Sequence, residues 1–141
     1  MAFFDDLSPY EYLPATVPGN VQALNVGWLD ERHPYATGAV SVGFLDALSL
    51  LARDAGQVRT RGWHDCPISH VGGEVAYPVA YDMSDGEVYL GGAEIRVVSK
   101  TGEWLIAPDL VLHYVAAHSY SPPIDFVDAV MERRIAPRLA A

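Results

Sequence analysis

The residues best suited to chemistry lie between positions 61 and 70, which read RGWHDCPISH and include the only cysteine of the chain. Thiolate sulfur and imidazole nitrogen are preferred ligands of Zn²⁺, and a structural zinc site holds four such donors in a tetrahedron. The spacing of His64, Cys66 and His70 would let one tight loop direct all three side chains to a common centre. The sequence therefore indicates a candidate zinc loop, although the paired C-x2-C motifs that make a zinc prediction strong are absent from it.

A fourth ligand would have to come from another part of the chain, where the remaining histidines are His33, His113 and His118. On a regular helix over 108–118, residues five positions apart point about 140° away from each other. We therefore expect at most one of His113 and His118 to contribute. The metal ligands predicted from the sequence are His64, Cys66, His70 and His113.

Two other interpretations of this loop stay open. In the first, the loop is a packed turn that contains a buried thiol and hydrogen-bonded histidines, with no chemical role. In the second, Cys66 is a nucleophile with a histidine as its base. Asp65 disfavours the required thiolate, and no signature of a cysteine enzyme surrounds the residue.

The charge of the chain restricts its partners. Acidic residues outnumber basic residues 18 to 9, for a formal net charge of −9, and residues 1–31 contain no lysine or arginine. Nucleic acids and anionic membrane surfaces would be repelled, so we expect neither as a partner. A basic protein would suit this charge, and the expected contact residues are Asp5, Asp6, Tyr10, Glu11, Asp30 and Glu31. Two simpler alternatives are that the acidity only maintains solubility and that the aromatic N-terminal segment only straps the core.

Length and composition favour a single folded domain over residues 1–141. Half of the residues are hydrophobic, which is enough to bury a core, and no repeat or linker divides the chain. One cysteine cannot form an internal disulfide, and the N-terminus lacks the features of a secretory signal. We therefore expect a cytoplasmic protein, whose oligomeric state the sequence does not determine.

Three helices are expected. The first spans 41–55, with Ser41 as its N-cap and Gly56 as a left-handed stop. The second spans 108–118 and begins with Pro108 and Asp109, and the third runs from about 123 to 134.

Strands are expected at 21–29 and within 88–107, where alternating apolar residues and the turn SKTG predict a hairpin or meander. Asp85-Gly86 is expected to form a turn between strands rather than a cation-binding loop. Because strands and helices do not alternate strictly, the predicted class is α+β. We expect a small, mostly antiparallel sheet, about three helices and an extended N-terminal arm.

Several blocks of the chain, taken together, resemble a known family. They are FFDDLSPYEY (3–12), LNVGWLDERHPYATG (24–38), TRGWHDCP (60–67), GGAEIRV (91–97) and APDLVLHYVAAHSYSPPIDFVDAV (107–130). The chain is similar to a family of small, uncharacterised bacterial proteins, mainly from actinomycetes, that carry a domain of unknown function. Relatives often have a second cysteine three residues after the position of Cys66, where this chain has Ser69. The resemblance implies no activity, and this difference disfavours a zinc ribbon.

Two functional hypotheses of different classes follow. The first is a non-catalytic protein-binding domain, similar to an immunity protein or an inhibitor, which would need no cofactor. The acid-only N-terminal segment and the lack of an assembled catalytic signature favour it. The alternative is a zinc-binding protein or a small metal-dependent enzyme that uses the loop of His64 and Cys66.

Overall fold

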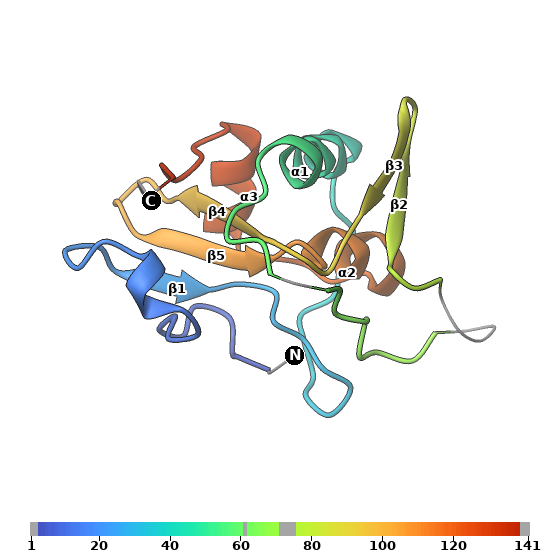
Figure 1. Ribbon diagram of the computed structural model, residues 1–141, viewed down its shortest axis with the longest axis horizontal. Helices are drawn as coiled ribbons and strands as arrows, with labels where there is room; N and C mark the ends of the chain where they lie inside the picture. The colour runs from blue at the N-terminus through green and yellow to red at the C-terminus, as the bar shows by residue number, and fades with distance from the viewer. Residues whose placement is uncertain (1–2, 61, 71–75, 139–141) are drawn as a thin grey trace.

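A computed structural model describes residues 3–60, 62–70 and 76–138 of the chain (Figure 1). The elements are, in order, η1 (Pro14–Thr16, a 3₁₀ turn), β1 (Ala23–Asn25), α1 (Val42–Asp54), β2 (Ala80–Met83), β3 (Gly86–Tyr89), β4 (Glu94–Val98), β5 (Trp104–Pro108), α2 (Val111–His118) and α3 (Ile124–Met131). These elements confirm the predicted α+β class. No helix in these ranges is both long enough and apolar enough to cross a membrane.

The main sheet has three strands in the order β1-β5-β4. The pairing of β4 with β5 is antiparallel and that of β1 with β5 is parallel. The predicted hairpin around SKTG is confirmed, and Gly102 adopts a φ of +96° in its turn. The turn before Gly86 is also confirmed, and it joins β2 and β3 in a separate two-stranded ribbon (Figure 1).

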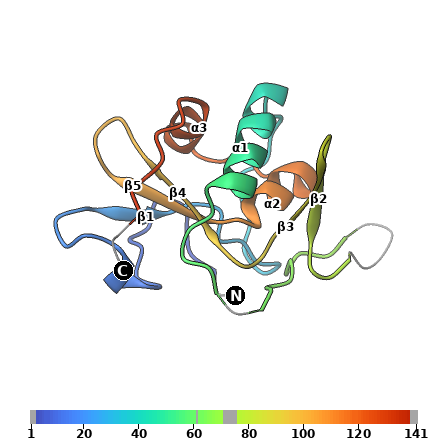
Figure 2. The same cartoon turned by 45° about the horizontal axis from the view of Figure 1, so that its top comes forward.

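Both faces of the main sheet are covered. In Figure 2, α1 and α3 lie on one side of the sheet and the N-terminal segment lies on the other. Side chains of β5 alternate accordingly: Leu105 and Ala107 join the core under the helices, whereas Trp104 and Ile106 pack beneath the N-terminal segment. A sheet buried on both faces explains why β5 is apolar at every position.

Helix α1 begins where the sequence predicts, because Ser41 Oγ accepts a hydrogen bond from the Phe44 amide at 3.0 Å. The predicted left-handed stop at Gly56 is wrong, since no positive φ occurs there and Ala55 caps the helix with a φ of −129°. Instead, Gly56 lies against Ala93, and a Cβ at position 56 would approach the Ala93 Cβ to 3.3 Å. Close packing, rather than helix termination, explains this glycine.

The predicted start of the second helix is also wrong. Pro108 is the last residue of β5, paired with Glu94, and α2 begins only at Val111. The Asp109 carboxylate does not cap the helix, because it accepts a hydrogen bond from the Gly91 amide at 2.7 Å. Sheet pairing and this internal contact therefore take precedence over the helix-start pattern.

The third helix is shorter than predicted. It ends at Met131, and Arg133 adopts a left-handed φ of 53°. The chain then turns back to the sheet, where the Val98 amide donates to the Arg134 carbonyl at 2.7 Å. Pairing of the following segment with the edge of β4 therefore ends the helix three residues before its predicted end.

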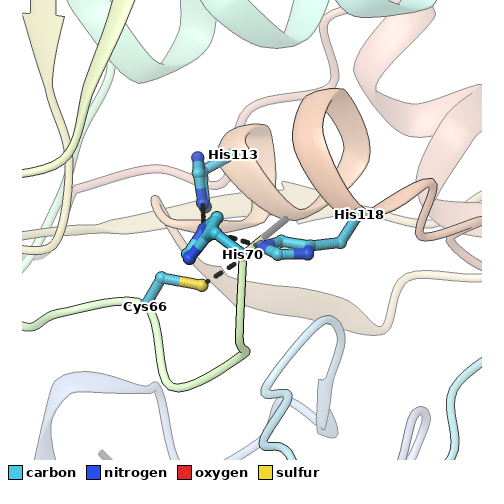
Figure 3. Close-up of side chains that lie close together, drawn as sticks. All are labelled: Cys66, His70, His113 and His118. Carbon is cyan, nitrogen blue, oxygen red and sulfur yellow. Dashed lines mark hydrogen bonds between the residues drawn. The ribbon is translucent and has the colours of Figure 1, made fainter. Parts of the chain in front are cut away.

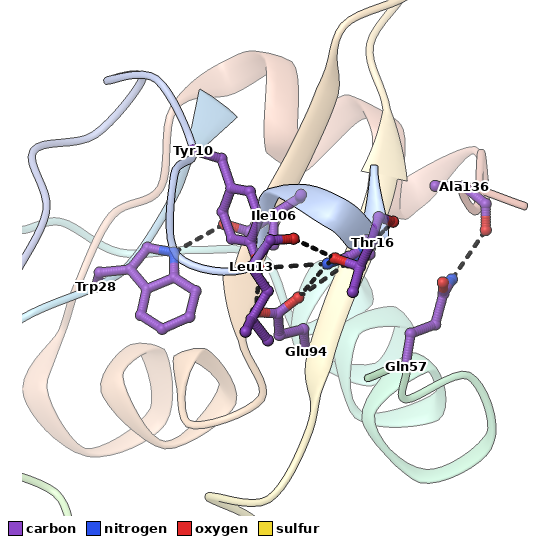
Figure 4. A network of polar contacts seen from close by, with 9 residues as sticks. Tyr10, Leu13, Thr16, Trp28, Gln57, Glu94, Ile106 and Ala136 are labelled. Atoms are coloured by element: carbon purple, nitrogen blue, oxygen red, sulfur yellow. Dashed lines mark hydrogen bonds and ion pairs between the residues drawn. The ribbon is translucent and has the colours of Figure 1, made fainter. Parts of the chain in front are cut away.

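The N-terminal segment is fastened to β4 by a buried polar network (Figure 4). The Tyr10 hydroxyl donates to Glu94 Oε2 at 2.8 Å, and Arg96 Nε donates to Glu94 Oε1 at 2.9 Å. Arg96 also donates to Thr16 Oγ1 at 2.6 Å. Tyr10 is only 6% exposed, so its hydroxyl serves this strap rather than an external surface.

Candidate metal centre

Four side chains that can ligate a metal converge where segment 62–70 lies against α2 (Figure 3). One ligand atom from each lies within 4.8 Å of all the others, and the four residues are Cys66, His70, His113 and His118. His70 Nε2 is 2.9 Å from His113 Nε2 and 3.0 Å from His118 Nε2. Cys66 Sγ is 3.4 Å from His118 Nε2. Thus one sulfur and three nitrogens, from two separate parts of the chain, surround one point.

These separations match the dimensions of a tetrahedral zinc site. With Zn–N bonds of about 2.0–2.1 Å and a Zn–S bond of about 2.3 Å, two nitrogens are about 3.3 Å apart and a sulfur–nitrogen pair is about 3.5 Å apart. The two nitrogen–nitrogen contacts and the one sulfur–nitrogen contact described above lie within a few tenths of an ångström of these values. The remaining pairs of donors lie within 4.8 Å of each other, so the more distant donors would move closer together to bind one ion.

Hydrogen bonding among the histidines does not satisfy this arrangement. An imidazole nitrogen carries either one proton or one lone pair, so it forms a single well-directed hydrogen bond. His70 Nε2 nevertheless faces two Nε2 atoms at hydrogen-bonding distance. A cation that accepts a lone pair from each ring would satisfy all three nitrogens together.

The electrostatics of the cluster favour the protonation state that a metal requires. Burial, reinforced by the charges of His118 and His70, lowers the pKa of His113 to about 4. Burial and the charge of His70 also lower the pKa of His118. Both rings are therefore neutral at pH 7 and keep lone pairs for a ligand. Burial raises the pKa of the Cys66 thiol, and a bound cation would reverse this effect by deprotonating the sulfur outright.

Helix α2 supplies two of the donors, in contrast to the expectation that at most one of His113 and His118 would serve. The 140° separation describes the directions in which the side chains leave the helix, not the final positions of the rings. Here the His113 and His118 ring centroids are only 5.1 Å apart, and the His70 ring centroid lies 5.2 Å and 4.6 Å from them (Figure 3). Ser119, in a left-handed conformation with a φ of 55°, ends the helix directly after His118.

Segment 62–70 supplies the other two donors and is fixed from both ends. The His64 amide donates to the Gly91 carbonyl at 2.8 Å, and a Cβ on Gly91 would overlap the His64 carbonyl oxygen. At the other end, the Ser69 hydroxyl donates to the Glu31 carboxylate. Between these contacts, Cys66 packs against the edge of the core.

The structure brings together three of the four predicted metal ligands and places His64 elsewhere. His64 lines a small cleft, partly open to solvent, together with Tyr12, Trp28 and Asp109. His118 takes its place in the cluster. Backbone pairing of His64 with Gly91 turns this residue away from the donors that follow it in sequence.

The residues expected to contact a partner are divided between internal and exposed roles. The Asp6 carboxylate accepts hydrogen bonds from the Gly27 amide at 2.9 Å and the Tyr120 hydroxyl at 2.8 Å. Asp30 Oδ1 lies 2.7 Å from His33 Nδ1 within one turn. The exposed carboxylates of the set are Asp5, Asp6, Glu11 and Glu31.

Comparison with known proteins gives a family but no activity. A family model described as a domain of unknown function (DUF7919) matches residues 2–131, so the chain belongs to this family. The match confirms the prediction of an uncharacterised family. No curated protein and no solved structure matches the chain.

Proposed function

We propose that this DUF7919 member is a zinc-binding protein whose ion is held by Cys66, His70, His113 and His118. The observation that carries the proposal is the approach of three imidazole nitrogens and one sulfur to within 4.8 Å of one another. His70 Nε2 contacts the Nε2 atoms of both His113 and His118. One imidazole nitrogen cannot form two well-directed hydrogen bonds, whereas a metal ion bound by all three nitrogens would satisfy them.

The donor set favours zinc over other metals. Hard cations such as Mg²⁺ and Ca²⁺ require oxygen ligands, and none of the four donors is an oxygen. A tetrahedral arrangement of sulfur and nitrogen donors suits Zn²⁺, which has no geometric preference of its own. Cobalt(II) should occupy the same position and report its geometry through its visible absorption.

The number of donors favours a structural role for the ion. Catalytic zinc sites hold the metal with three protein ligands and keep one position for water, whereas this site supplies four. The connection from α1 to β2 has no helix or strand in its described residues 55–60, 62–70 and 76–79. Connections of this length without elements of their own are uncommon in a compact domain, and a metal ion that closes such a loop adds a stabilising constraint. The ion would supply one by tying Cys66 and His70 to α2.

The proposed role agrees with the expected cellular setting. In a bacterial cytoplasm, which the sequence predicts, reducing conditions would keep Cys66 available as a ligand. The acidic protein-binding face is a separate hypothesis, because Asp5 and Glu11 are exposed and take no part in the cluster.

The test is elemental analysis of protein purified without a histidine tag or a chelator. We expect about one zinc per chain, and we expect Cys66→Ala and His113→Ala to lose most of it. His64→Ala is the matched control, since it removes a neighbouring histidine that lies outside the cluster. Circular dichroism of each variant, together with cobalt(II) absorption after reconstitution, separates loss of the site from loss of the fold.

Two results would overturn the proposal. One is wild-type protein that is folded but takes up neither zinc nor cobalt. The other is a His64→Ala variant that loses as much zinc as His113→Ala while both stay folded.

A further inference from the structure

We propose that Cys66 is an oxidative modification site, at which a peroxide converts the metal centre from a closed site to one that releases its ion. The inference rests on the proposed zinc function and extends it to regulation. It concerns the four-residue cluster as a unit, because the outcome depends on which donors remain after the sulfur is changed.

The sulfur is the one donor of the cluster that readily undergoes two-electron oxidation. Zn²⁺ has no redox chemistry, so an oxidant that enters the site reacts with the ligand rather than with the ion. Cys66 is half-buried and lies in segment 62–70, outside any helix or strand. Thiolate character and exposure are the properties that make a cysteine susceptible to peroxide.

The reaction is a displacement at oxygen. The Cys66 sulfur attacks one oxygen of hydrogen peroxide, so that an S–O bond forms and the O–O bond breaks. Sulfur loses two electrons and the peroxide gains them. The departing hydroxide takes a proton from solvent and leaves as water, and the product is a sulfenic acid.

The oxidised centre binds the ion less tightly for two reasons. It keeps only three donors, and all of them are neutral imidazoles, so the anionic ligand that offsets the charge of the ion is lost. Moreover, His70 is then the only ligand that ties segment 62–70 to α2. Release of zinc would leave that segment held by the Tyr77–Trp63, His64–Gly91 and Ser69–Glu31 hydrogen bonds.

The sulfenic acid is a reversible product, and its reduction depends on an external thiol because the chain has no second cysteine. An internal disulfide cannot form, so the sulfenic acid awaits a small thiol from solution. That thiol condenses with it to a mixed disulfide and water, and a second thiol molecule releases the Cys66 thiol and forms the small-molecule disulfide.

The experiment is a titration of zinc-loaded protein with hydrogen peroxide, with released zinc followed by a chromophoric chelator. Peptide mass spectrometry locates the added oxygen and distinguishes Cys66 from the exposed Met131. We expect about one zinc released for each Cys66 oxidised, with equal rates for the two events. Zinc binding should return after treatment with a small thiol.

The matched control is Cys66→Asp, which keeps an anionic donor and removes the sulfur. Loaded with zinc, this variant should release no more ion with peroxide than without it. If the variant does not bind zinc, the inference is tested by whether zinc release and Cys66 oxidation have equal rates in the wild-type protein. Release of zinc without oxidation of Cys66, or oxidation of Cys66 with the zinc retained, would overturn the inference. Absence of zinc in the starting protein would instead contradict the proposed function.

Discussion

The buried ion pair beneath the N-terminal strap gives the sharpest stability prediction. The Arg96 and Glu94 side chains are only 2% and 5% exposed, and Arg96 Nη2 lies 2.8 Å from Glu94 Oε1. Arg96→Met keeps an unbranched side chain in this space but removes the charge. Glu94 would then be a buried carboxylate whose remaining side-chain partner is the Tyr10 hydroxyl.

Removing one partner of a buried pair typically costs about 3–5 kcal/mol, because the other charge is left uncompensated. The folded state of an ordinary domain is favoured by only about 5–15 kcal/mol, so the variant should be severely destabilised. Burial already raises the pKa of Glu94, and loss of Arg96 should raise this pKa further. The destabilisation should therefore decrease at lower pH, where Glu94 becomes protonated.

Urea denaturation followed by tryptophan fluorescence measures the effect. Trp28 belongs to the cluster of side chains under the strap, so its emission reports on this region. The double variant Arg96→Met/Glu94→Gln removes the uncompensated charge and should recover a large part of the lost free energy of unfolding. A loss below about 1 kcal/mol in Arg96→Met, or a double variant as unstable as the single one, would refute the reasoning.

Two further predictions concern the metal centre. Gly91→Ala should lower the free energy of unfolding by about 2 kcal/mol or more, because Gly91 has a φ of +103° that an alanine rarely adopts. The same substitution should lower the zinc affinity, because the new Cβ would displace His64 and the segment that follows it. Gly19→Ala, which has open space around it, is the control, and equal zinc affinities by competition titration would contradict this account. In chelator-treated protein, the pKa of His113 is about 4 in the folded state and roughly 6.5 in the unfolded chain. Because the unfolded state binds the proton more tightly, the free energy of unfolding should fall as the pH decreases from about 6.5 to about 4. Denaturation at pH 7 and pH 5 should show a larger decrease for wild type than for His113→Asn, and parallel decreases would show that His113 is not responsible.

The parts of the fold that follow from local rules could be predicted from the sequence. The N-cap at Ser41 and the hairpin turn at Gly102 depend on residues within a few positions of each other. The start of α2 could not be predicted in this way. Pro108 and Asp109 fit a helix start, but Pro108 pairs with β4 and the Asp109 carboxylate binds the Gly91 amide. Contacts between residues distant in sequence determine those positions.

The candidate site was predictable in its chemistry and less so in its membership. Cysteine and histidine in one short segment indicated a metal, but sequence spacing favoured His64, which backbone pairing with Gly91 turns toward another cleft. Helix geometry predicted at most one donor from His113 and His118, and the predicted ligand set included His113. The His118 ring belongs to the cluster because tertiary structure places the His70 ring beside it, with the two ring centroids 4.6 Å apart (Figure 3).

X-ray absorption at the zinc edge of the purified protein tests the central claim most directly, because it reports the atoms bound to the ion. The account predicts one sulfur at about 2.3 Å and three nitrogens at about 2.0–2.1 Å. The sulfur shell should disappear in Cys66→Ala, whereas the spectrum of His64→Ala should match that of wild type. A zinc ion surrounded only by nitrogen and oxygen in the wild-type protein would contradict the account.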